Sequence, residues 1–336
     1  MSVLGRHELT CPLCRRAFTT VTCSQSNARG GVDRDLFTRA LGPQPEFYRV
    51  STCPRCGYSG YASDFGAGVS LPAEFRERVL AEPKLPLPEG FGPESDPRDL
   101  GAADRYALAI QCYQWRHKPD EALAWLHLRA SWVAREEGSV LPPDDRLARV
   151  FAFAARWRPV LAEGDNQADG ELRMATHLVE AAAVGRFNRY QRPYVELAAA
   201  LILRRHGENR PAAVILDRLA GSRRGAAPQP DDAGAFSTAL LEGIDRMRAS
   251  IGQERRQQRA AAACFERALL AGQIDAANRG PACYLLGELY RRLGQEPDAA
   301  RWFDQALADE RLPDGLRTWA REQKTSCGGT QAGREP

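Results

Sequence analysis

Hydrophobic and polar residues follow two different patterns along this 336-residue chain. Near the N-terminus, Phe18–Thr22 and the aromatic, alternating segment Glu46–Val50 are typical of β-strands. From Asp104 onward, alanine, leucine and arginine recur at the spacing of amphipathic helices. The pattern therefore predicts a small β module followed by a mostly α-helical remainder.

Glycine and proline interrupt the helical pattern and divide it into antiparallel helices. The interruptions lie at 138–143, 164–170, 207–209 and 221–234. A short helix is predicted at Leu71–Ala81, and the proline- and glycine-rich stretch Pro83–Pro97 is expected to be a linker. The expected parts are a zinc-ribbon-like module at 1–66, a helix and linker at 67–100, a helical body at 101–324 and a disordered tail at 325–336.

The clearest internal repeat lies near the C-terminal end of the body, at 280–313. Its apolar and small residues flank a turn at Gly294 with the spacing of a tetratricopeptide repeat: Tyr284, Leu286, Gly287, Tyr290, Ala299, Phe303 and Ala306. Phe265–Leu269 is similar in sequence to Phe303–Leu307. Two further segments, Tyr106–Glu136 and Tyr194–Leu219, are also expected to form helical hairpins. The expected body is a stack of helical hairpins, because a single hairpin cannot bury its apolar face alone.

Two short cysteine motifs carry the candidate chemistry. Cys11-Pro-Leu-Cys14 and Cys53-Pro-Arg-Cys56-Gly57 are two copies of a tight turn that directs two thiolates at one point. Gly57 can adopt the positive φ that such a turn favours, whereas Arg15 stands at the matching position of the first motif. The sequence predicts that Cys11, Cys14, Cys53 and Cys56 bind one structural Zn²⁺.

Redox chemistry is the alternative use of paired cysteines. It requires a low-pKa thiolate at a helix N-terminus, whereas the segment after the first motif is predicted to be a strand. A catalytic zinc ion keeps one ligand position open for water, and four cysteine ligands close the coordination shell. The predicted ion therefore holds structure without doing chemistry, and Cys23 and His7 are expected to be bystanders.

An unusually long insertion separates the two motifs. Thirty-eight residues lie between Cys14 and Cys53, more than the roughly 15 to 20 of a compact zinc ribbon. The insertion contains Asp33-Arg34-Asp35, for which capping or surface salt bridging is the favoured interpretation and ligand contact is the alternative. Because the module buries little apolar surface unaided, loss of the metal is expected to unfold it.

Composition and charge do not point to a particular partner. The chain is 26% charged with a net charge of +3, so no strong field attracts nucleic acid or a membrane. The first ten residues lack the apolar stretch of a signal peptide, and the longest apolar run, Leu197–Leu203, is far shorter than the roughly 20 residues that span a bilayer. A cytoplasmic location is expected.

The motifs together resemble an uncharacterised bacterial domain-of-unknown-function family, in which a CPxC…CPxCGY module precedes tetratricopeptide-like helices. The matching segments are Cys11–Cys14, Asp33–Asp35, Tyr48, Cys53–Tyr58, Phe65 and Leu126–Arg135, with the C-terminal repeat. The resemblance implies a zinc-ribbon-like head and a helical body, and it implies no established activity. Arg15 and the irregular repeats depart from the family's pattern.

Three functional hypotheses follow. The favoured one is a non-catalytic adaptor whose helical body binds a protein or peptide partner, because the chain has no phosphate-binding loop, dinucleotide fingerprint, HExxH or GxSxG motif. The alternative is nucleic-acid binding by the head, where eight arginines outnumber five acids and Phe18, Phe47 and Tyr48 could stack on bases. An enzyme that uses Asp33 and Asp35, or a thiol, is the third. The sequence gives neither the partner nor the oligomeric state.

Overall fold

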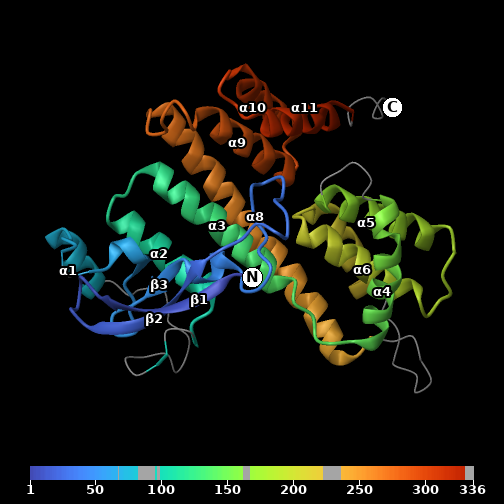
Figure 1. Ribbon diagram of the computed structural model, residues 1–336, viewed down its shortest axis with the longest axis horizontal. Helices are drawn as coiled ribbons and strands as arrows, with labels where there is room; N and C mark the ends of the chain where they lie inside the picture. The colour runs from blue at the N-terminus through green and yellow to red at the C-terminus, as the bar shows by residue number, and fades with distance from the viewer. Residues whose placement is uncertain (67, 82–94, 97–98, 162–166, 222–235, 330–336) are drawn as a thin grey trace. The chain divides into compact units, whose positions relative to one another are not determined.

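The computed structural model describes residues 1–66, 68–81, 95–96, 99–161, 167–221 and 236–329 (Figure 1). Within these residues the chain forms eleven α-helices and two separate two-stranded sheets. Both sheets lie near the N-terminus, and the helices follow. The predicted fold class, a small β module followed by helical hairpins, is confirmed.

Contacts group the residues into two compact units. Unit 1 contains Met1–Gly30, Asp35–Val133 and Arg256–Pro336. Unit 2 contains Gly31–Arg34 and Ala134–Arg255. The N-terminal module and the C-terminal repeat therefore belong to the same unit, a grouping that periodicity along the chain does not reveal.

Two antiparallel hairpins form the N-terminal module. The strands are β1 (Val3–Thr10) paired with β2 (Ala17–Gln25), and β3 (Val50–Thr52) paired with β4 (Ser59–Tyr61). The strand predicted at Phe18–Thr22 is confirmed as part of β2. The strand predicted at Glu46–Val50 is wrong for most of its length, because Pro45–Tyr48 forms a 3₁₀ helix, η1, with proline at its start.

The helices have the following bounds. They are α1 (Ala73–Ala81), α2 (Ala102–Trp115), α3 (Asp120–Gly138), α4 (Asp145–Leu161), α5 (Gln167–Ala183), α6 (Arg192–Arg205), α7 (Asn209–Gly221), α8 (Thr238–Leu270), α9 (Arg279–Leu293), α10 (Glu296–Ala308) and α11 (Asp314–Gly329). A second 3₁₀ helix, η2 (Ala62–Asp64), follows β4. α3 and α8 contribute residues to both units.

These bounds agree with most of the predicted helical segments. α1 confirms the short helix, and the interruptions at 138–143 and 207–209 fall at the junctions between α3 and α4 and between α6 and α7. Gly170 instead lies in the first turn of α5, where its N–H needs no acceptor within the helix. Thr325–Gly329 of the predicted tail belong to α11. The rest of that tail, most of the Pro83–Pro97 linker and nearly all of 221–234 lie outside the described residues.

The α9–α10 hairpin has the close packing that its sequence predicts. Gly294 ends α9 with a left-handed φ of 80°. Gly287 lies against the ring of Phe303, where an added Cβ would come within 2.6 Å of the ring carbons. The pairs α2–α3 and α6–α7 are also consecutive helices joined by short turns. The assignment of these hairpins as tetratricopeptide repeats stays a prediction. Phe265–Leu269, the segment that resembles Phe303–Leu307, lies within α8, which runs unbroken for 33 residues.

Replacing Gly287 with alanine tests this close approach. The new methyl group overlaps the ring of Phe303, so we expect Gly287→Ala to lower the free energy of unfolding by about 1–3 kcal/mol. Gly315→Ala is the matched control, because an added Cβ there meets no atom within 4 Å. Urea unfolding of both variants measures the difference. Equal midpoints for the two would contradict the packing described.

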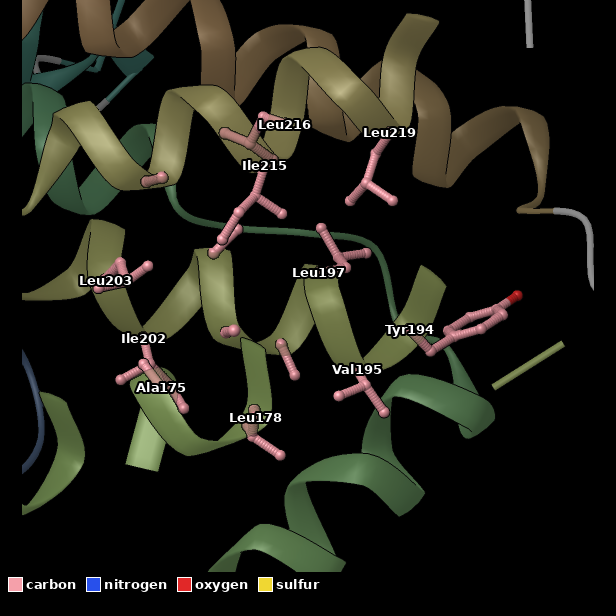
Figure 2. Packing of buried hydrophobic residues seen from close by; sticks show 14 of the residues in the cluster. Ala175, Leu178, Tyr194, Val195, Leu197, Ile202, Leu203, Ile215, Leu216 and Leu219 are labelled. Carbon is pink, nitrogen blue, oxygen red and sulfur yellow. The ribbon is translucent and has the colours of Figure 1, made fainter. Parts of the chain in front are cut away.

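Unit 2 has an apolar core of its own. Figure 2 shows α6 between α7 and α5, with Leu197 and Ile215 on facing sides of α6 and α7 and Ile202 close to Ala175 of α5. Leu197, Ala198, Ala199 and Ala200 of α6 are fully buried. A helix that is apolar on several faces is stable only where neighbouring helices cover those faces. Burial in this core accounts for the long apolar run Leu197–Leu203.

Candidate metal centre

The two cysteine motifs form the turns of the two hairpins and share one backbone geometry. The N–H of Cys11 donates to the carbonyl of Arg16 at 2.9 Å, and the N–H of Cys53 donates to the carbonyl of Tyr58 at 2.8 Å. Arg15 and Gly57 occupy equivalent positions, with φ values of 60° and 72°. Arg15 therefore adopts the left-handed conformation expected of glycine, at a cost of roughly 1–2 kcal/mol.

The structure brings together the four cysteines predicted as ligands. Their Sγ atoms all lie within 4.8 Å of one another. The Sγ atoms of Cys11 and Cys56 are 3.5 Å apart, and those of Cys14 and Cys53 are 3.6 Å apart. Disulfide sulfurs are separated by about 2.05 Å. Sulfurs bound at 2.3 Å to a tetrahedral ion are separated by about 3.8 Å, so this cluster has the dimensions of a four-coordinate metal site.

The cluster is buried beneath aromatic side chains. Cys11 and Cys53 are fully buried and Cys56 is nearly so, whereas Cys14 is partly exposed. The rings of Phe18, Tyr58, Phe65 and Phe75 form a chain of edge-to-face contacts beside the sulfurs. Phe75 comes from α1, which sequence analysis placed outside the module. The guanidinium of Arg76 on α1 also donates to the carbonyl of Pro12 at 3.3 Å, so α1 is part of the cover of the site.

Because the sulfurs are packed closely together, the pKa values of their thiols shift in different directions. The pKa of Cys53 is lowered, because the thiols of Cys11 and Cys56 donate hydrogen bonds to its sulfur. The pKa of Cys11 is raised by its hydrogen bond to Cys53, and that of Cys56 is raised by its hydrogen bonds to Cys11 and Cys53. The arrangement stabilises one thiolate among neighbouring thiols, and only a cation at the centre would stabilise several thiolates at once.

A buried carboxylate fixes the second hairpin to α2. Asp64 accepts hydrogen bonds from the hydroxyl of Tyr113 at 2.5 Å, from the guanidinium of Arg116 at 2.9 Å and from the N–H of Tyr61 at 3.0 Å. Arg116 also donates to the hydroxyl of Tyr58 at 2.8 Å. Sequence analysis missed Asp64, because two of its partners lie about fifty residues away along the chain.

Asp33 and Asp35 are buried, so their interpretation as surface salt bridges is wrong. In unit 2, Asp33 accepts from Arg135 at 3.3 Å and pairs with His206 at 3.0 Å. In unit 1, Asp35 accepts from the indole N–H of Trp132 at 3.1 Å and pairs with Arg292 at 3.3 Å. The N–H of Phe37 also donates to Asp35 at 3.4 Å, a contact of the capping type that the sequence predicts. The insertion thus places two buried carboxylates, those of Asp33 and Asp35, beside cationic side chains from distant parts of the chain.

Neither expected bystander belongs to the sulfur cluster. The thiol of Cys23 donates to the carbonyl of Gln25 in β2 at 2.9 Å, and His7 lies on β1. Within the described part of the chain, the four cysteines are the one group found with three or more potential metal ligands.

No described helix is both long enough and apolar enough to cross a membrane.

Comparison with known proteins places the chain in a family. The family model "Uncharacterized protein conserved in bacteria (DUF2225)" matches residues 4–230 and 246–327. The chain belongs to the DUF2225 family. This confirms the resemblance inferred from the CPxC and CPxCGY motifs, and the matched segments include both motifs and the helices of both units. No match was found among curated proteins or among solved structures.

Proposed function

We propose that this DUF2225 protein is a non-catalytic zinc-binding adaptor of the cytoplasm. In this proposal, Cys11, Cys14, Cys53 and Cys56 hold one Zn²⁺ that stabilises the ribbon, and the helical body binds another protein. The observation that supports it most directly is the four-sulfur cluster, because four thiolates satisfy the coordination of zinc and leave no ligand position for water or substrate. The absence of disulfides among the cysteines fits a reducing compartment.

Metal analysis of the purified, untagged protein tests the first half of the proposal. We expect about one zinc ion per chain, released with four thiol equivalents on treatment with a thiol-specific mercurial. Stepwise addition of the mercurial measures the thiol equivalents, and a colorimetric metal indicator in the same solution measures the zinc released. Far less than one metal ion per chain, in protein whose ribbon is still folded, would contradict the assignment, and so would stoichiometric iron.

A cavity on unit 2 supports the second half. It has a volume of about 680 Å³, and α4, α5 and the residues that follow α5 form its walls. Its apolar lining includes Phe153 and Val184, whose exposed fractions of 44% and 71% are high for such side chains. His177 and Glu180 on its wall pair with each other, whereas none of the described residues pairs with the guanidinium of Arg186. We infer that the occupant is an amphipathic partner helix with an acidic flank.

A charge placed in this cavity tests the adaptor role. Val184→Glu removes an apolar contact and opposes an acidic partner, so we expect it to abolish recovery of the partner by quantitative affinity purification from the host bacterium. Val214→Glu is the matched control, because Val214 on α7 is similarly exposed at 67% and does not line the cavity. Recovery of the same proteins by both variants would contradict this docking site.

A further inference from the structure

A second, polar cavity lies in unit 1. Its volume is about 430 Å³, within the range of small-molecule sites. β2, η1, β4, η2 and α3 each contribute to its lining. The polar and sulfur-bearing side chains of that lining belong to Thr22, Cys23, Ser26, Tyr48, Arg49, Tyr61, Ser63 and Arg129. No part of the metal centre belongs to it, so it needs a separate explanation.

Two arginines in this cavity are held in place by one buried carboxylate. Glu46 is 8% exposed and accepts a hydrogen bond from Nε of Arg49 at 2.6 Å. Its other oxygen lies 3.6 Å from Nε of Arg129. Arg129 in turn donates to the hydroxyl of Tyr61 at 2.5 Å, with its guanidinium over the Tyr61 ring. Because one carboxylate serves two guanidinium groups, this cluster keeps a net charge of +1.

The cavity contains more hydrogen-bond donors than the protein uses. Nε of Arg129 is buried and has no hydrogen-bond partner. Among the described residues, no acceptor bonds to Nη2 of Arg129 or to either Nη of Arg49. The hydroxyls of Thr22, Ser26, Tyr48 and Ser63 likewise have no partner within the described residues. A fixed pair of guanidinium groups, surrounded by hydroxyls, is the donor set that phosphate oxygens require.

We propose that this cavity binds the phosphate group of a small phosphorylated molecule. The two guanidinium groups bind the phosphate oxygens, and the remaining volume, flanked by Tyr48 and Tyr61, holds the organic part of the ligand. A carboxylate alone would satisfy few of these donors and would leave most of the cavity empty. This site is independent of the zinc ion and of the proposed partner surface. It also gives a role to Arg129, which lies in the Leu126–Arg135 segment that resembles the family pattern.

Isothermal titration of the intact protein tests the site, with inorganic phosphate, a nucleoside monophosphate and a single-stranded oligonucleotide as probes. We expect the monophosphate to bind and Arg49→Gln to weaken its binding by about tenfold or more. The side chain of Arg49 is about half exposed, at 47%, so this variant is expected to fold. Arg301→Gln is the matched control, because Arg301 is exposed and pairs with an acid three residues earlier, as Arg49 does, but does not line this cavity.

Each outcome decides the proposal. Binding of phosphate or monophosphate that depends on Arg49 and not on Arg301 supports it and identifies a free small molecule as the source of the phosphate. Arg49-dependent binding of the oligonucleotide alone, steeply weakened by salt, supports the phosphate site and makes a nucleic acid the source. Absence of binding of every probe at about 10 mM, or equal weakening by both variants, overturns the proposal and leaves the zinc and partner proposals unaffected.

Discussion

Replacement of Cys53 by serine is expected to release the metal and unfold the N-terminal module. Three thiolates bind Zn²⁺ far more weakly than four, and a zinc ion contributes on the order of 10 kcal/mol to the folding of small structural sites. The two sheets have few strands, and β3 and β4 contain three residues each. Such short hairpins are not stable alone. Without the ion, the aromatic side chains of Phe18, Tyr58 and Phe65 lose the buried sulfurs against which they pack.

Hydrogen exchange followed by mass spectrometry locates this effect. In Cys53→Ser we expect loss of protection in β1, β2, β3 and β4, and also in α1, since Phe75 and Val79 pack into the same cluster. The core of α5, α6 and α7 in unit 2 is expected to keep its protection, because it is built from other residues. A chelator that strips zinc from the wild-type protein should produce the same pattern.

Cys23→Ser is the control for this experiment. Cys23 lies on β2 in the same module and its thiol donates only to the carbonyl of Gln25, a bond that a serine hydroxyl can also make. We expect it to keep one zinc ion and wild-type protection. If Cys53→Ser exchanges no faster than Cys23→Ser, the four-sulfur site does not organise the module.

The four-cysteine cluster could be predicted from the sequence because its signal is local. Each pair of ligands lies within four residues, and proline and the spacing of the cysteines define the turn before any long-range contact exists. Even Arg15, a departure from the expected glycine, takes a positive φ. The turn geometry is therefore imposed by the motif as a whole, and one unfavourable residue does not abolish it.

The surroundings of the site depend on contacts that no local pattern encodes. α1 was recognised as a helix from its periodicity, but its packing on the sulfurs through Phe75 is a tertiary contact. Aspartate is usually exposed, so nothing in the local sequence marks Asp64 as buried. Asp64 is buried because α2 packs nearby and places Tyr113 and Arg116 against it. The strand expected at Glu46–Val50 failed for a local reason, because Pro45 starts a 3₁₀ helix that overrides the alternating pattern.

The contacts of the insertion between the motifs are also long-range. Two acids around an arginine in a polar segment usually pair on the surface, yet Asp33 and Asp35 are both nearly inaccessible to solvent. Their partners, Arg135, His206, Trp132 and Arg292, lie about 100 to 260 residues further along the chain. A buried carboxylate needs such partners to offset its desolvation, and a single sequence does not show them.

The buried charge network of unit 2 gives the second large expected effect. Glu254 is fully buried and bridges two fully buried arginines, accepting from Nε of Arg135 at 3.0 Å and from Nη1 of Arg204. Arg204 also donates to Asn209 at 2.9 Å and to Ser250 at 3.1 Å. Burial lowers the pKa of Arg204, and the charge of Glu254 opposes this shift. Glu254 therefore stabilises two cations that water cannot reach.

Replacing Glu254 with glutamine leaves these cations undercompensated. The amide keeps the size of the side chain and removes its charge, so we expect Glu254→Gln to lower the free energy of unfolding of unit 2 by about 3–5 kcal/mol. Urea unfolding monitored by hydrogen exchange in α5, α6 and α7 measures the loss. Asp217→Asn is the control, because Asp217 pairs with Arg248 on the surface at 2.6 Å with an exposed fraction of 62%. An exposed pair contributes about 0–1 kcal/mol.

A second substitution distinguishes lost charge balance from lost packing. If Glu254→Gln destabilises unit 2 because a buried cation is left without its anion, then adding Arg204→Met removes that cation and restores part of the stability. The double variant is then more stable than Glu254→Gln alone, although Arg204→Met by itself is destabilising. If the network acts only through shape and hydrogen bonds, the double variant is no more stable than Glu254→Gln alone, because removing Arg204 relieves no unpaired charge. A double variant that is less stable than Glu254→Gln alone would therefore contradict an electrostatic role for Glu254 and place the stability of unit 2 in its apolar core.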